Sequence, residues 1–107
     1  LDRVFVFVAS SGILVRIMIS VVFTENIQRH VACPPALVSG AATVGEVLDR
    51  VFEGNERVRG YVLDDLGAVR KHMVVFINGK PIRDRATLSD TVIDGSEVYV
   101  MQALSGG

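Results

Sequence analysis

The sequence has no tryptophan, one cysteine and three prolines in 107 residues, and these shortages exclude several classes of protein. The single cysteine, Cys33, can form neither a disulfide framework nor a CxxC redox pair nor a Cys-based metal site, and it fits a reducing, cytoplasmic setting. The sequence also has no large excess of one charge, since 11 Lys and Arg and 12 Asp and Glu give a net charge of −1. That balance argues against a nucleic-acid binder that works by neutralising phosphates. Half of the residues are apolar, which is enough for one core and one domain.

The start of the sequence has an apolar run, but a short one. Val4 to Val8 are all apolar, and the run ends near Ala9. It is too short to cross a membrane and makes a weak secretory signal, so we expect no membrane partner. We expect residues 1–17 to be an N-terminal extension, with two interpretations left open: an extra strand of the domain or an artificial remnant.

A strand pattern begins at Met18. Apolar and more polar residues alternate over residues 18–24, which is typical of a half-buried strand. Glu25-Asn26 can turn the chain, and we expect residues 27–33 to return as a second strand. Pro34-Pro35 interrupts that pairing because proline donates no backbone hydrogen bond, so we expect residues 34–42 to form a loop.

The strongest helix signal begins at Thr43. Thr43 and Glu46 have the spacing of a capping box, in which each side chain accepts a backbone N–H at the helix start. Apolar residues then recur at helical spacing on one face, at Val44, Val47, Leu48, Val51 and Phe52. Gly54-Asn55 supplies a stop. The sequence therefore predicts one amphipathic helix with a single buried face.

The second half of the chain is predicted to add three strands. A short helical turn and a loop over residues 56–71 precede them. Asn78-Gly79 predicts a tight hairpin, because both central residues of that turn need positive φ, and Asp94-Gly95 predicts a further turn. The predicted strands are residues 73–77, 80–83 and 97–103. The order ββ–α–β–β–β predicts an α+β domain.

One helix covers only one face of a small sheet, which leaves the other face to be explained. If Val75 and Val98 face the helix, strand alternation places four apolar side chains on the opposite face: Val74, Phe76, Tyr99 and Met101. In one interpretation they are ordinary exposed groups, or residues 4–14 cover them. In the other they form a docking patch for a partner protein, because contiguous exposed apolar area is uncommon on monomers.

Residue types that carry catalysis or bind metals occur singly. Cys33 beside Pro34 fits a small buried hydrophobe better than a sulfur relay. His30 and His72 have no Asp, Cys or second His at ligand spacing, so no metal site is predicted. No nucleophile motif or acid–base pair is present. The sequence thus predicts a protein that is not itself an enzyme.

The features collected so far resemble one family. The capped helix between two halves of a sheet, the segments "VFINGKPI" and "DGSEVYVMQALSGG" and the final Gly-Gly resemble the ubiquitin-like β-grasp sulfur carriers of the MoaD/ThiS family. The resemblance covers residues 18–107, and the long loops make the chain more similar to MoaD and the cysteine-biosynthesis carrier CysO than to ThiS. Two positions depart from it: Gln102, where MoaD-like carriers often have proline, and Ser105, where they often have alanine.

The resemblance implies a fold, a division of the chain and a reactive group. The fold is a mixed sheet of about four to five strands packed on one main helix. Residues 18–103 would form the β-grasp domain and residues 104–107 a flexible Gly-Gly tail. The reactive group would be the carboxylate of Gly107, with Gly106 beside it, at the tip of a tail that can thread a narrow channel.

The resemblance also implies partners. In this family an ATP-dependent adenylating enzyme activates the terminal carboxylate, and a sulfur donor converts it to a thiocarboxylate. A sulfur-accepting synthase, of the molybdopterin synthase large subunit or cysteine synthase type, then receives the sulfur. The carrier holds no permanent cofactor, and ATP is used by the activating partner. The residues implied to contact partners are Val74, Phe76, Tyr99, Met101, Leu104 and Ser105.

Two other functions stay open at this point. One is a ubiquitin-like modifier that is joined to other proteins through Gly107. The other is a β-grasp binding module in which the Gly-Gly is incidental. Within the carrier hypothesis, the loop lengths favour molybdopterin or cysteine biosynthesis over thiazole or tRNA as the destination of the sulfur.

Overall fold

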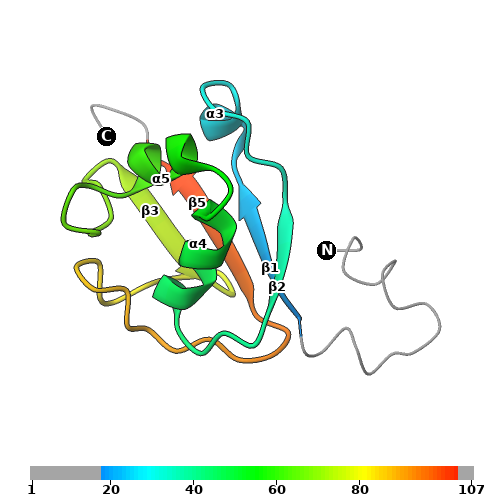
Figure 1. Ribbon diagram of the computed structural model, residues 1–107. Coiled ribbons are helices and arrows are strands. Elements are labelled where there is room, and N and C mark those ends of the chain that lie inside the picture. The colour runs from blue at the N-terminus through cyan, green and yellow to red at the C-terminus, as the bar shows by residue number, and fades with distance from the viewer. Residues whose placement is uncertain (1–17, 104–107) are drawn as a thin grey trace.

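The computed structural model describes residues 18–103, which form one five-stranded sheet with helices on one face (Figure 1). The strand order is β2-β1-β5-β3-β4. The strands are β1 (Met18–Phe23), β2 (Ala36–Ser39), β3 (Met73–Ile77), β4 (Lys80–Pro81) and β5 (Glu97–Gln102). The helices are α3 (Glu25–Gln28), α4 (Val44–Phe52) and α5 (Glu56–Val62).

The centre of the sheet is a parallel pair made from the first and last described strands. β1 and β5 run in the same direction with Val21 opposite Val98 and Phe23 opposite Val100. The other neighbouring strands are antiparallel, so the sheet is mixed. Val21, Val98 and Val100 have no exposed surface, as expected for β-branched residues in a central pair.

Helix α4 begins where the capping box predicts. The Thr43 hydroxyl accepts a hydrogen bond from the Glu46 N–H at 3.2 Å, and Glu46 Oε1 accepts one from the Ala42 N–H at 2.7 Å. The backbone N–H groups of Val44 and Gly45, in the first turn of the helix, donate to the carbonyls of Asp90 and Leu88 in a loop that is distant in sequence. The backbone N–H groups at the start of α4 are therefore hydrogen-bonded by the capping box and by this loop.

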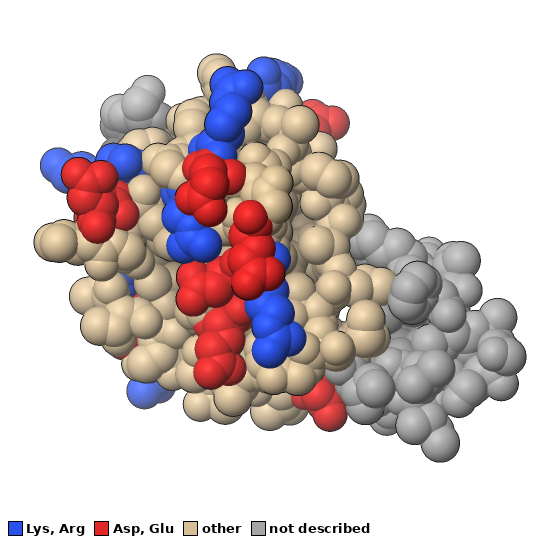
Figure 2. Space-filling model, in the orientation of Figure 1, with Lys and Arg blue, Asp and Glu red and all other residues tan. Residues whose placement is uncertain are grey.

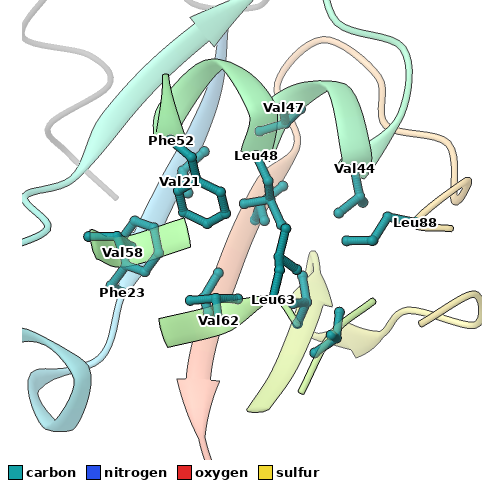
Figure 3. Packing of buried hydrophobic residues seen from close by; sticks show 14 of the residues in the cluster. Val21, Phe23, Val44, Val47, Leu48, Phe52, Val58, Val62, Leu63 and Leu88 are labelled. Atoms are coloured by element: carbon teal, nitrogen blue, oxygen red, sulfur yellow. The ribbon is translucent and has the colours of Figure 1, made fainter. Parts of the chain in front are cut away.

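The apolar stripe of α4 packs directly on the sheet. Figure 3 shows Val47, Leu48 and Phe52 pointing towards β1 and the neighbouring strands. The ring centroids of Phe23 and Phe52 lie 6.3 Å apart. Helix α5 closes the end of this core with Val58 and Val62. A mixed sheet that wraps one main helix is the predicted α+β, ubiquitin-like β-grasp fold.

The predicted second strand was wrong. Residues 25–28 form helix α3 instead, which buries Ile27, and its last turn closes through a hydrogen bond from the Arg29 N–H to the Glu25 carbonyl. The returning strand is β2, which lies inside the segment 34–42 that was predicted to be a loop. It starts immediately after Pro34-Pro35, because Ala36 is the first residue there whose N–H can join a ladder with β1.

The remaining elements differ in length more than in kind. The segment predicted as a helical turn contains the seven-residue helix α5, and the strand predicted over 80–83 ends at Pro81. The Asn78-Gly79 turn is confirmed, with φ of 50° and 87° at its two residues.

Within residues 18–103, no helix is long and apolar enough to cross a membrane. The predicted extension 1–17 and tail 104–107 lie outside the described residues.

Candidate functional site: the outer sheet face and the end of strand β5

The face of the sheet that points away from α4 carries the four apolar residues that strand alternation placed there. Phe76 on β3 is directly opposite Tyr99 on β5, and Val74 is opposite Met101. The residues between them in sequence, such as Val75 and Val100, are completely buried on the other face. Tyr99 is the most exposed of the four at 39%, and Val74, Phe76 and Met101 are half-buried. These four side chains therefore form one contiguous patch.

Two further residues extend this patch, and sequence reasoning did not single them out. Val22 on β1 is paired with Tyr99, and Pro81 on β4 is paired with Phe76. The result is an apolar row across four neighbouring strands, from Pro81 through Phe76 and Tyr99 to Val22. The missing information was the strand order. Val22 lies beside Tyr99 because β1 pairs with β5, and the sequence of β1 alone does not show that pairing. We call Val22, Val74, Phe76, Pro81, Tyr99 and Met101 the outer face.

The helix side of the domain is different in character. Figure 2 shows acidic and basic side chains intermixed in a band over this side. Arg59 on α5 lies 3.2 Å from a carboxylate oxygen of Asp49 and 3.3 Å from one of Glu56. Because the signs alternate, this side presents no strong field of one sign. The described residues that define the outer face carry no charge, whereas the helix side carries this charged band.

The end of β5 lies beside α5, as Figure 1 shows. Gln102 is the last residue of the strand, and its side-chain Oε1 accepts a hydrogen bond from the Tyr61 hydroxyl at 3.1 Å. The N–H of Ala103 donates to the His72 carbonyl at 2.8 Å. The other predicted site residues, Leu104, Ser105, Gly106 and Gly107, lie outside the described residues. Their roles stay predictions.

Cys33 lies in a position that disfavours a chemical role. Its exposed fraction is 4%, and its thiol donates to the Val31 carbonyl at 3.3 Å. Burial raises the pKa of the Cys33 thiol, which disfavours the reactive thiolate at neutral pH. The residue therefore packs as a small hydrophobe.

The two histidines each make a contact of another kind than metal binding among the described residues. The His30 ring stacks on Tyr61 with 5.6 Å between ring centroids. His72 contributes its backbone carbonyl to the bond with Ala103. Within residues 18–103, no three potential ligands among His, Cys, Asp and Glu come together.

Two carboxylates organise the loop that follows β4 and caps α4. Asp84 accepts hydrogen bonds from the hydroxyls of Ser89 and Thr87 and from their backbone N–H groups, and these bonds hold its pKa well below the usual range. Asp90 accepts from the backbone N–H groups of Arg83 and Asp84, which lower its pKa as well. The bonds of the loop thus favour the ionised form of both side chains.

Comparison with known proteins gives a family and a set of structural neighbours. The model of the ThiS family matches residues 31–107. SAMP1 from Haloferax volcanii has a TM-score of 0.69 and 22% identity, covering 84% of this chain and 99% of its own. A chain of the BexX/CysO complex from Amycolatopsis orientalis has a TM-score of 0.66 and 21% identity, covering 83% and 99%. Urm1 from Trypanosoma brucei has a TM-score of 0.62 and 17% identity, covering 85% and 96%.

At these identities the structural neighbours show the fold alone, and no curated protein matches the chain significantly. The family match is a separate finding, and it spans well over half of the chain. It includes α4, the outer-face residues of β3 to β5 and the final Gly-Gly. The chain therefore belongs to the ThiS family, the ubiquitin-like sulfur carriers of the MoaD/ThiS type.

Proposed function

We propose that this protein carries sulfur as a thiocarboxylate on Gly107, after an ATP-dependent enzyme has adenylated that carboxylate. The observation that carries the proposal is the family match, which runs through Gly106 and Gly107. The fold is compatible with it, because the sequence that ends in those two residues follows β5, the central strand of the sheet.

The chemistry needs two displacement steps. A Gly107 carboxylate oxygen attacks the α-phosphorus of ATP, which forms the acyl-adenylate and releases pyrophosphate. Hydrosulfide then attacks the acyl carbon, so that a C–S bond forms, the C–O bond to AMP breaks and AMP leaves. Both steps take place in the active site of the partner, which explains why the carrier needs no acid–base pair of its own.

Docking of the folded domain has to supply the energy for this delivery. Threading a glycine-rich segment into a channel costs about 1–2 kcal/mol for each residue that becomes ordered. The outer face is a contiguous apolar surface, and Tyr99 and Phe76 lie at its centre. We therefore assign Val74, Phe76, Tyr99 and Met101 to partner binding, with Leu104 and Ser105 following them into the partner.

The partners in this proposal are an adenylating enzyme, a sulfur donor and a sulfur-accepting synthase. The carrier holds no permanent cofactor and delivers sulfur for molybdopterin or cysteine biosynthesis. The structure similar to this chain in which CysO is complexed with BexX supports a role in which the domain docks on a partner protein.

The test is the intact mass of the protein after incubation with a family-type adenylating enzyme, ATP and sulfide. We expect one oxygen to be replaced by sulfur, located in the peptide that ends at Gly107. The matched controls are a variant without Gly107 and one extended past it, both folded and both unconverted. Conversion of the Gly107-deleted variant, or no conversion of the wild type by several such enzymes, would contradict the proposal.

A ubiquitin-like modifier is the second candidate, because SAMP1, described as a small archaeal modifier protein, has the same fold. Both functions begin with adenylation of the same carboxylate. They differ in the product, so isopeptide-linked adducts of Gly107 on lysines of other proteins would favour the modifier. Unchanged function after removal of the tail would favour a simple binding module.

A further inference from the structure

The last residues of β5 pair with another strand on one side only. Among the described residues, the pairing of β5 with β1 ends at Phe23 and Val100, and the Thr24 N–H makes the final bond on that side, to the Val100 carbonyl. The pairing with β3 continues further, to Met73 and Gln102. Met101 and Gln102 are thus held by a strand on one side, which is where a sheet frays first.

A side chain from α5 supplies a second support at this point. Even-numbered residues of β5 face the helices, as the complete burial of Val98 and Val100 shows, so Gln102 points to the same side as α5. The Tyr61 hydroxyl donates to Gln102 Oε1 at 3.1 Å, across 41 residues of sequence. The next N–H, of Ala103, donates to His72. The Gln102 side chain is therefore held by α5, and the Ala103 backbone is held by the residue that precedes β3.

The tyrosine ring has contacts of its own besides this bond. Its ring is half-buried and stacks on His30, with ring centroids 5.6 Å apart and ring planes 29° apart. A donor whose ring is already fixed loses little further freedom when it binds the glutamine. The contact is thus suited to restraining the strand end.

We propose that the Tyr61–Gln102 hydrogen bond is a positioning contact that fixes the end of strand β5, from which the sequence continues into residues 104–107. Its value for activation rests on the proposed function. A carrier whose strand end is already ordered gives up less entropy when the adenylating enzyme takes up residues 104–107, so it binds more tightly at the same chemical rate. Tyr61 and Gln102 would then affect KM and leave kcat unchanged.

The experiment compares variants that differ in the bond and little else. Tyr61→Phe removes the donor, and Gln102→Met removes the acceptor at similar side-chain length. Gln102→Glu keeps an oxygen acceptor and is the matched control. The first measurement is the ¹⁵N heteronuclear NOE of the Ala103 amide, which requires no partner. The second is KM and kcat for adenylation, measured by ATP–pyrophosphate exchange.

We expect a lower Ala103 NOE and about a fivefold rise in KM for Y61F and Q102M, with wild-type values for Q102E, since loss of one net hydrogen bond corresponds to roughly that factor. The double variant Y61F/Q102M should be no worse than either single variant. An unchanged NOE in Y61F and Q102M would overturn the inference, even if no enzyme adenylates the wild type. An altered NOE with unchanged KM would overturn its link to activation while leaving the sulfur-carrier proposal intact.

Discussion

Replacement of Tyr99 by threonine is the sharpest test of the outer face. Aromatic side chains bury about 150–250 Å² when fully covered, so the 39% exposed fraction of Tyr99 leaves roughly 80 Å² for a partner to cover. At about 25 cal/mol per Å², that area is worth about 2 kcal/mol, or about 30-fold in Kd. We expect Y99T to weaken binding of the adenylating enzyme by up to that factor.

The domain itself should be little affected by this change. Threonine suits a strand, and the main loss within the domain is the cross-strand pair with Phe76, which is worth about 0.2–1 kcal/mol. Isothermal titration calorimetry with the adenylating enzyme measures the Kd, and urea unfolding measures the stability. A large loss of stability in Y99T would mean that the residue is structural.

Two matched controls separate a docking face from general surface apolarity. Leu66 is 91% exposed, and it lines a pocket on the helix side with Leu48 and Leu63, while Ile93 is 68% exposed in a loop. Both expose a larger fraction of an apolar side chain than Tyr99 does. We expect L66T and I93T to bind as the wild type does. If they weaken binding as much as Y99T, the assignment of the outer face is refuted.

Three further predictions concern the stability of the domain. Thr43→Ala removes the hydroxyl that accepts from Glu46, and we expect it to lower the free energy of unfolding by about 1 kcal/mol in urea titrations, with m unchanged. Phe52 is completely buried, so Phe52→Ala should cost about 3–5 kcal/mol and Phe52→Leu about 1 kcal/mol by the same assay; equal costs would contradict the packing shown in Figure 3. The pKa values of Asp84 and Asp90 are lowered in the folded state, so their stabilisation is fully present above the unfolded pKa of about 4 and is lost as pH falls through the folded values. Denaturant midpoints from pH 7 down to about 2 should therefore fall less steeply in Asp84→Asn than in the wild type, and parallel curves would show that the loop bonds do not persist in solution.

The elements predicted correctly from sequence are those with local causes. Helix α4 follows from a capping residue and a stripe within one short segment, and the hairpin follows from two adjacent residues that accept positive φ, Asn78 and Gly79. The alternation in β3 and β5 gave the correct faces for the same reason, since it depends on neighbouring residues alone. Each of these signals can be evaluated without knowledge of the fold.

Three features that the sequence did not predict depend on distant parts of the chain. β2 is a strand because β1 offers it a partner, and its four residues carry too little pattern to predict it. Leu88 adopts a positive φ of 55°, which is unusual for leucine, while its side chain is buried and its carbonyl accepts from Gly45 at the start of α4. The contact of Tyr61 with Gln102 joins two elements whose proximity follows from the whole topology.

The central place of β5 has a consequence for how the protein is made. β5 separates β1 from β3 in the sheet, so the two halves of the sheet cannot join before the ribosome has released the last strand. Folding then has to bring β1 and β5 together, which are the first and last described strands. Pairing over such a long separation in sequence slows folding relative to a domain with local pairings. A chain that stops before Glu97 lacks the strand that holds the core together. Nascent or truncated chains without β5 would therefore present no folded domain to a partner, and docking of a folded domain would select chains that contain β5.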